Sequence, residues 1–219
     1  MWIEPANDDI ELMAVRLPGR ERLFDQAPLN NMQEIGRPLG DMLAGMSSAG
    51  PIGLFGYCAG AFAAFEAARR MTERQAPPSL LAVCSQVAPH INAVESPVHA
   101  LPASRLRQYL RSLGGTDPVV LENEEFWELA VPALRADYAA AETYWASSEP
   151  KISCDIISFR GTRDEDVTSE QIDAWSQVTT GAYVPHLLDA GHFMLQSHAA
   201  DVLGQVQCRL LARVQSQTS

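Results

Sequence analysis

Short, mostly apolar runs alternate with segments of helical spacing along most of the chain. Runs of this kind are typical of parallel strands that helices cover on both faces. They predict strands over residues 10–17, 52–57, 80–86, 154–159 and 183–188. The segments around them predict helices over residues 39–48, 61–74, 169–178 and 198–213. This alternation predicts an α/β fold with a mostly parallel sheet and right-handed crossovers.

One long stretch departs from the alternation. From about residue 101 to residue 148 helical spacing continues without a strand-like run, with breaks at Gly114-Gly115 and Pro118. We expect a helical lid over the carboxyl edge of the sheet, where ligands bind in α/β folds. Its aromatic side chains are expected in packing more than in lining a pocket: Phe126, Trp127, Tyr138, Tyr144 and Trp145. The length of 219 residues fits one domain over residues 1–219.

The hinge between the second predicted strand and the following helix carries the first candidate chemistry. The sequence Gly-Tyr-Cys-Ala-Gly, with Cys58 at its centre, has the Gly-x-nucleophile-x-Gly frame of a nucleophile elbow. Gly56 and Gly60 lack Cβ atoms, so we expect the backbone to turn sharply there and present the thiol. We expect Ala59, at the helix start, to offer its backbone N–H to an oxyanion. The alternative is a tight turn with a buried structural cysteine.

Two later loops supply the partners that such a nucleophile needs. His192 follows the strand predicted over residues 183–188 and is the candidate base. Asp164 follows the preceding strand and is the candidate acid, with Asp166 as its competitor. Carboxyl ends of parallel strands share one edge of the sheet, so we expect Cys58, Asp164 and His192 to meet there. Their chain order of nucleophile, acid and histidine is that of α/β-hydrolases.

The charge balance limits the possible partners. The chain has 16 Lys and Arg against 27 Asp and Glu, a net charge of −11, so we expect no nucleic-acid partner. Arg105, Arg107 and Arg111 offer a basic area for an acidic partner, although a solvated helix face is the simpler interpretation. No apolar run is long enough to span a membrane and no signal-peptide pattern is present, so we expect no membrane association.

Cysteine spacing and missing cofactor motifs narrow the chemistry further. The four cysteines are widely spaced, which favours free thiols in a reducing cytoplasm. We expect Cys84, Cys154 and Cys208 to lie in the core. The sequence has no glycine motif for a dinucleotide or a phosphate and no metal-ligand spacing of histidines. We therefore expect no cofactor and no metal.

Seven segments give the chain a family resemblance. They are residues 15–21, with Leu-Pro-Gly-Arg-Glu; 85–90, with Ser-x-x-x-Pro-His; 113–116; 132–137; 161–167, with Gly-x-x-Asp-x-x-Val; 179–181; and 191–193, with Gly-His-Phe. Over nearly its whole length the chain resembles the type II thioesterases of polyketide and nonribosomal peptide biosynthesis. These are α/β-hydrolases that act in trans on acyl groups held by carrier proteins. In that family the aspartate three residues before the valine is the triad acid, which favours Asp164.

The resemblance implies acyl or peptidyl carrier protein domains as partners, with the substrate attached to their phosphopantetheine. We expect Tyr57, His90 and Phe193 to contact the substrate, with a simple turn position as the alternative for His90. The identity of the acyl group and the oligomeric state are not predicted.

Two features of this chain differ from the family pattern. The family elbow is usually Gly-His-Ser-Met-Gly, and here Tyr57-Cys58-Ala59 replaces its centre. Relatives also carry an amino-terminal strand that ends in a His-Ala-Gly-Gly-type loop, which supplies a second oxyanion N–H. Nothing here matches it, so we expect the natural protein to begin upstream of Met1. Loss of one oxyanion donor typically costs about 10²–10³-fold in rate.

The sulfur at the elbow leaves three functions open. A cysteine acyl-enzyme is itself a thioester, so its acyl group can pass to water or, almost reversibly, to another thiol. The first hypothesis is hydrolysis of acyl or aminoacyl groups from carrier proteins. The second is transfer of such a group from one carrier to another through Cys58. The third is a truncated, non-enzymatic hydrolase relative that binds carrier domains.

Overall fold

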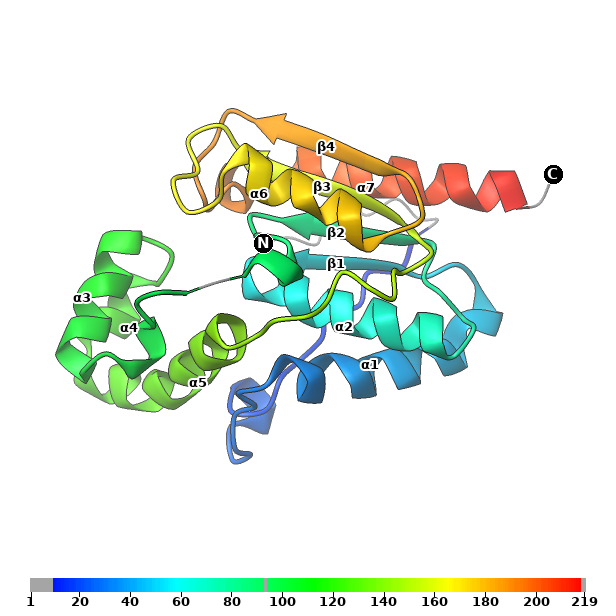
Figure 1. Ribbon diagram of the computed structural model, residues 1–219. Coiled ribbons are helices and arrows are strands. Elements are labelled where there is room, and N and C mark those ends of the chain that lie inside the picture. Colours follow the sequence, from blue (N-terminus) through cyan, green and yellow to red (C-terminus); the bar gives the residue numbers. More distant parts are fainter. Residues whose placement is uncertain (1–9, 93, 218–219) are drawn as a thin grey trace.

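A single parallel sheet organises the chain. The computed structural model describes residues 10–92 and 94–217, and its four strands are ordered β1-β2-β3-β4 (Figure 1). They are β1 (Gly53–Tyr57), β2 (Leu80–Cys84), β3 (Asp155–Gly161) and β4 (Tyr183–Leu188). The register pairs Tyr57 with Cys84 and Cys84 with Phe159. The carboxyl ends of the strands therefore meet at one edge.

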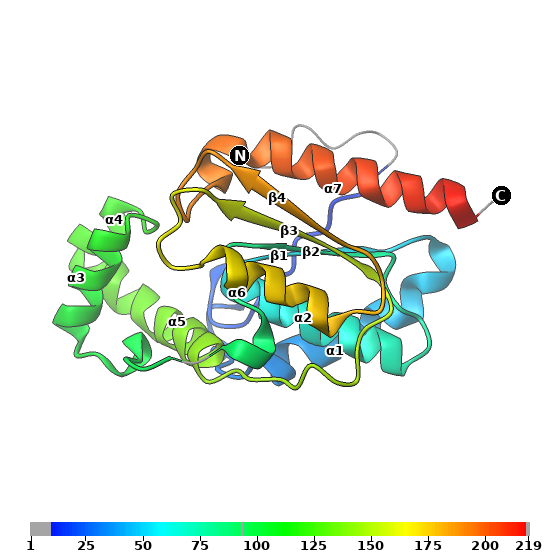
Figure 2. The ribbon, with the colours of Figure 1, turned by 45° about the horizontal axis from the view of Figure 1, so that its top comes forward.

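Helices cover both faces of this sheet (Figure 2). On one face lie α1 (Met32–Met46), α2 (Ala59–Glu73) and α6 (Ser169–Asp173), and on the other lies α7 (Leu195–Gln217). Strand β2 is buried along its whole length, and its side chains alternate between the two apolar clusters. Leu81 and Val83 belong to the cluster on the α2 face, and Leu80 and Ala82 to the cluster on the α7 face. The expected two-sided α/β sheet is confirmed.

Helix α1 begins seven residues earlier than its apolar spacing predicts. The side chain of Asn31 accepts hydrogen bonds from the backbone N–H groups of Gln33 and Glu34, which caps the helix start. Gly36 then lets α1 approach α2, since a Cβ there would lie 2.6 Å from the Ala63 carbonyl oxygen. This close packing fixes α2, whose first turn follows Cys58.

Three helices form the lid beyond the carboxyl ends of the strands (Figure 1). They are α3 (Ala103–Leu113), α4 (Pro118–Glu122) and α5 (Glu124–Glu142). Gly114 ends α3 in the left-handed conformation, with φ +78°, as a helix-ending glycine does. Asp117 caps α4 through the backbone N–H of Val119, with Pro118 as its first residue. The expected helices and their breaks lie where the sequence predicts them.

The strand predicted over residues 10–17 is wrong. These residues form no strand, and the side chains of Leu12, Met13 and Val15 are 46%, 53% and 58% exposed. An apolar run becomes a strand only where its backbone groups pair with a neighbouring strand. The described residues provide no such partner for this segment, which instead leads into the turn at Pro18-Gly19.

Helix α7 shows why the core position predicted for Cys208 is also wrong. The helix packs Val202, Val206 and Leu210 onto the sheet at intervals of four residues. Cys208 lies off that face and is exposed, whereas Cys84 and Cys154 are buried as predicted; all four thiols are free. Within residues 10–92 and 94–217, no helix has both the length and the apolar character required to cross a bilayer.

Candidate active site

Cys58 lies in a sharp turn between β1 and α2. Its backbone has φ +50° and ψ −128°, a conformation that side-chain-bearing residues rarely adopt. The Cys58 N–H holds the turn by donating to the Cys84 carbonyl oxygen at 2.8 Å. A Cβ at Gly56 would lie 2.4 Å from the Ala61 Cα, so the turn requires glycine there. At Gly60 a Cβ would meet nothing within 4 Å. The close backbone approach expected at both glycines therefore occurs at Gly56 and not at Gly60.

The start of α2 lies directly after the thiol. Ala59 is its first residue, so its N–H has no acceptor within the helix and lies at the positive end of the helix dipole. A cavity of about 190 Å³ adjoins this helix start. It is lined by Leu17, Arg20, Met32, Ile35, Ala59, Gly60, Ala63 and Asp137. The space beside the expected oxyanion donor is therefore mostly apolar.

The two other predicted catalytic residues lie together at the same edge of the sheet. His192 Nδ1 lies 3.1 Å and 3.2 Å from the two carboxylate oxygens of Asp164. The Asp164 side chain is completely buried, and its Oδ1 accepts the backbone N–H of Asp166 at 3.0 Å. Cys58 is also close enough to the His192 ring for its sulfur to raise the pKa of the imidazole. Three stretches far apart in sequence thus bring a thiol, an imidazole and a carboxylate together, with the imidazole hydrogen-bonded to the carboxylate.

The electrostatics of these three groups favour a proton on His192. Burial lowers the pKa of His192, but the hydrogen bond with Asp164 and the neighbouring Cys58 sulfur outweigh burial and raise the pKa to about 10. Burial also raises the pKa of Asp164, and the hydrogen bond with His192 and that imidazole's charge more than compensate, so this pKa lies below its usual value. A carboxylate and an imidazolium therefore face each other beside the sulfur at neutral pH.

Asp166 is a second, weaker carboxylate partner of the same ring. Its Oδ2 lies 3.5 Å from His192 Nδ1, and its side chain is 53% exposed, whereas that of Asp164 is buried. Among the described residues, His192 and the two aspartates also have donor atoms within 4.8 Å of one another, close enough to share a metal ion. The hydrogen bonds of His192 Nδ1 with Asp164 already use two of these groups. The arrangement favours Asp164 as the orienting acid.

Two hydroxyl groups hold the histidine loop in place. The Tyr57 hydroxyl donates to the His192 carbonyl oxygen at 2.8 Å, and the Ser85 hydroxyl donates to the same oxygen at 3.1 Å. The Tyr57 hydroxyl is thus engaged with the backbone, and the contact of Tyr57 with the substrate stays a prediction. The role of Ser85 was missed. The signal available in the sequence is its position directly after β2, at the shared edge.

Phe193 packs against the candidate histidine, and His90 lies in the turn after β2. The Phe193 ring packs edge-on against the His192 ring, with centroids 5.2 Å apart. It also touches the lid, since a Cβ at Gly115 would lie 2.2 Å from Phe193 ring atoms. His90 lies in the short turn after β2, and its buried ring nitrogens have no hydrogen-bond partner among the described residues. Phe193 therefore connects the histidine loop to the lid, and the His90 ring is left for water or a ligand.

Of the lid aromatics expected mainly in packing, Trp127 and Tyr144 are buried, whereas Phe126 and Trp145 are 48% and 59% exposed. Trp127 is buried under the guanidinium of Arg107, and the buried Tyr144 hydroxyl donates to Glu66 at 2.7 Å. Tyr138 differs, because burial raises its pKa and the neighbouring Tyr109 and Cys58 raise it further. Burial, Asp166 and Cys58 likewise raise the pKa of Tyr109, whose ring packs edge-on against Tyr138. Sequence reasoning missed Tyr109, which lies on α3 opposite Tyr138 on α5.

Comparisons with known proteins show which family the chain resembles. The sequence model of the thioesterase domain family matches residues 2–210. The gramicidin S biosynthesis protein GrsT of Aneurinibacillus migulanus is 30% identical over 214 residues, which cover 97% of this chain and 83% of that protein. The solved structure of the type II thioesterase BorB from the borrelidin biosynthetic cluster is 36% identical, with a TM-score of 0.79 over 90% of this chain and 80% of that one. The RedJ thioesterase from the prodiginine pathway in Streptomyces coelicolor is 30% identical, with a TM-score of 0.84 over 94% of this chain and 83% of that one.

Proposed function

Because the chain belongs to the thioesterase domain family, we propose that it is a thioester hydrolase that acts in trans on carrier proteins. Its substrates are acyl or aminoacyl groups on the phosphopantetheine of acyl or peptidyl carrier domains, in a polyketide or nonribosomal peptide pathway. The names of its relatives support this assignment, since they include a gramicidin S biosynthesis protein and the thioesterase PikA5 of Streptomyces venezuelae. Family membership also argues against the non-enzymatic alternative.

One observation carries the proposed mechanism. The cluster of Cys58, His192 and Asp164 supplies a nucleophile, a proton carrier and an orienting acid. The thiolate, not the thiol, is the attacking form of cysteine, and the neighbouring imidazole can carry the proton that the thiol gives up. No further group is needed for the chemistry, and phosphopantetheine enters as part of the substrate.

The reaction takes two steps. The Cys58 sulfur bonds to the thioester carbonyl carbon, and the Ala59 N–H donates to the oxyanion that forms. The carbon–sulfur bond to pantetheine then breaks, and the departing thiolate takes the proton of His192. In the second step the oxygen of a water molecule attacks the carbonyl carbon of the acyl-enzyme, and His192 takes a proton from that water. The acid is released, and the sulfur of Cys58 leaves as thiolate.

The sulfur at the elbow specifically favours a second candidate function. Acyl transfer from pantetheine to Cys58 exchanges one thioester for another, so its free-energy change is small and the step is reversible. A second carrier thiol can therefore compete with water for the acyl group. In this case the protein shuttles acyl or aminoacyl groups between carriers.

One experiment separates the two functions. A carrier protein loaded with a radiolabelled acyl group is incubated with the protein, with and without a second, unloaded carrier. Free acid released without the acceptor is the expected result and supports hydrolysis. Label that moves to the acceptor without release of acid would establish transfer instead. Label that stays on the first carrier in both mixtures would contradict both functions.

A further inference from the structure

We propose that Arg160 is a positioning residue that holds the loop of Asp164 in its catalytic geometry. The inference rests on the proposed roles of Asp164 and His192 and concerns how the fold keeps them together. Arg160 is the next-to-last residue of β3, on the face of the sheet that α6 covers.

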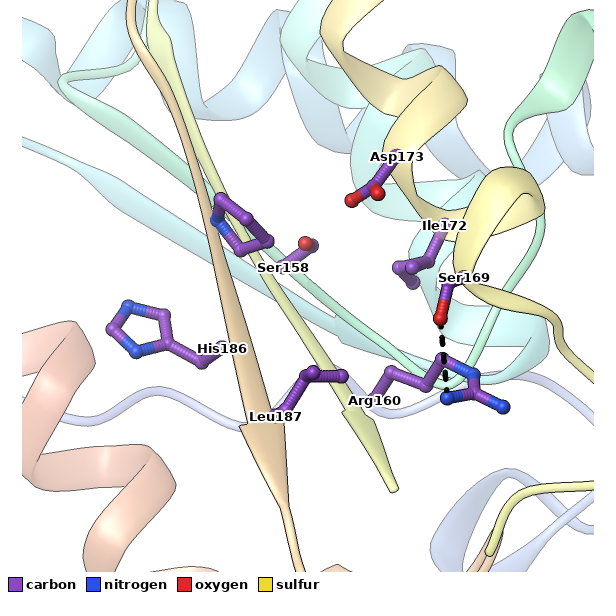
Figure 3. A pocket seen from close by; sticks show the side chains of 8 residues that line it. Ser158, Arg160, Ser169, Ile172, Asp173, His186 and Leu187 are labelled. Carbon is purple, nitrogen blue, oxygen red and sulfur yellow. Dashed lines mark hydrogen bonds between the residues drawn. The ribbon is translucent and has the colours of Figure 1, made fainter. Parts of the chain in front are cut away.

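The Arg160 guanidinium reaches across the whole acid loop. Its Nε donates to the Val167 carbonyl oxygen, and its Nη2 donates to the Asp164 carbonyl oxygen at 3.1 Å. Its Nη1 lies 3.5 Å from the hydroxyl of Ser169, the first residue of α6 (Figure 3). One planar cation therefore binds both ends of the segment from Asp164 to Val167.

The acid loop needs such a contact because it has little regular structure of its own. Residues 162–168 form turns and bends between β3 and α6, so their carbonyl groups lie outside the ladders of helices and sheets. The carboxylate of Asp164 is nevertheless completely buried and must meet His192 Nδ1 at 3.1 Å. A displacement of about 1 Å at a catalytic group can cost about 10²-fold in rate. Arg160 supplies the rigidity that the loop backbone does not.

The surroundings of Arg160 allow a direct test of this role. The side chain lines a cavity of about 270 Å³ between α6 and β4 (Figure 3). The other lining residues are Ser158, Ser169, Ile172, Asp173, Pro185, His186 and Leu187. A truncated residue 160 would leave open space beside the two carbonyl oxygens. A free guanidinium ion can enter that space and restore the hydrogen bonds.

The test compares Arg160→Ala, Arg160→Lys and a control, Arg37→Ala, which removes an exposed arginine paired with Glu73. The readouts are kcat and KM for a small acyl thioester, the pH dependence of Cys58 alkylation by iodoacetamide, and the melting temperature. We expect Arg160→Ala to lower kcat about 10-fold to 100-fold with KM nearly unchanged, because it displaces Asp164. Arg160→Lys is intermediate, since one ammonium cannot span both carbonyls. Arg37→Ala resembles the wild type.

Two further results distinguish positioning from general stability. Millimolar guanidinium should restore kcat several-fold in Arg160→Ala but not in Asp164→Asn. In Arg160→Ala, the pH dependence of Cys58 alkylation should report a pKa for His192 that is lower than in the wild type. The titratable groups near the His192 ring are Cys58, Asp164, Asp166 and Tyr57.

Wild-type kcat and an unchanged alkylation profile in Arg160→Ala would overturn the proposal. So would a loss of kcat that neither lysine nor guanidinium restores in a folded variant. A wild-type protein that hydrolyses no thioester would contradict the proposed function alone, because the alkylation profile still tests Arg160.

Discussion

The sheet core and the helical lid hold their parts together in different ways. In the core, the two central strands β2 and β3 are buried on both faces, and the triad residues follow β1, β3 and β4 at a common edge. The lid has a small apolar cluster of its own, made of Leu106, Leu110, Leu121 and Trp127. It contacts the core through apolar residues at the carboxyl end of α5, where Ala140 and the following Tyr144 belong to the main apolar cluster, and through directional polar groups. Apolar burial thus fixes both the candidate triad and this end of the lid, and hydrogen bonds strengthen the attachment of the lid.

The polar contacts of the lid are specific. Both guanidinium Nη atoms of Arg20 bind the two Asp137 carboxylate oxygens of α5, at 2.9 Å and 2.8 Å. The Asn92 amide donates to the carbonyl oxygens of Ala141 and Tyr144 at the end of the lid. Hydrogen bonds of this kind can break one at a time, whereas the packing of a continuous apolar core is lost cooperatively. The part of the lid away from the buried end of α5 is therefore expected to move without dismantling the triad.

Removal of the nucleophile should have the largest effect. Cys58→Ala leaves the strand-to-helix turn without a sulfur, so hydrolysis of a carrier-bound acyl group should fall at least about 10³-fold. Steady-state release of free acid measures the effect. Cys208→Ala, which removes an exposed thiol on α7, serves as the control and should keep wild-type activity. Comparable losses in both variants would contradict the assignment of Cys58.

Substitution of the two aspartates beside His192 should lower kcat to very different extents. Asp164→Asn removes the buried carboxylate and should lower kcat about 10²–10⁴-fold. Asp166→Asn removes a half-exposed charge that solvent screens, so a change of less than about 5-fold is expected. Kinetics of the two single variants measure the difference. Equal losses would mean that the two carboxylates share the role.

The same variants test the pH dependence of stability. The pKa of His192 is raised from 6.5 to about 10, so its interaction with Asp164 stabilises the fold fully below pH 6.5. This contribution is lost as the pH rises from 6.5 through about 10. The free energy of unfolding of the wild type should therefore exceed that of Asp164→Asn most at the low end of this window. A difference that grows with pH would contradict the assigned shift.

A change at the contact between lid and histidine loop should have a moderate effect. A Cβ in Gly115→Ala would overlap the Phe193 ring and force the two apart. We expect a several-fold change in KM with a nearly unchanged melting temperature, because the apolar core is not involved. Gly45→Ala is the matched control, since a Cβ there meets nothing within 4 Å. An equal KM in both variants would show that this contact does not shape the site.

The ion pair between Arg20 and Asp137 should have the smallest effect. Each side chain is about one-third exposed, at 32% and 33%, so solvent weakens the pair. We expect Asp137→Asn to change KM by less than about 3-fold and to leave kcat unchanged. A double-mutant cycle with Arg20→Lys measures the coupling. A loss of kcat comparable to that of Asp164→Asn would mean that the lid is part of the catalytic machinery.

The sequence predicts the core better than the contacts around it. Strand β4 has the predicted bounds, and Cys58, Asp164 and His192 meet as their positions after three strands require. Residues 10–17 mislead because pairing with a strand depends on distant residues that a local pattern does not include. The core position predicted for Cys208 is wrong because the prediction used the residue type and not the position of Cys208 on the helix.

The supporting contacts were beyond local reasoning for a different reason. Tyr57, Ser85 and Arg160 all act through hydrogen bonds to backbone carbonyl groups in loops. Such bonds depend on where a loop passes in space, and no spacing rule encodes that path. The sequence therefore predicts which residues react and leaves open which residues hold them.

Mass spectrometry of the intact protein during turnover tests the central claim most directly. The protein is mixed with an acyl-loaded carrier, quenched in acid and digested to locate the added acyl mass. The account predicts one acyl group on the peptide that contains Cys58, absent from Cys58→Ala and enriched in His192→Ala supplied with a highly reactive thioester. Hydrolysis with the acyl mass on another residue, or undiminished hydrolysis by Cys58→Ala, would contradict it.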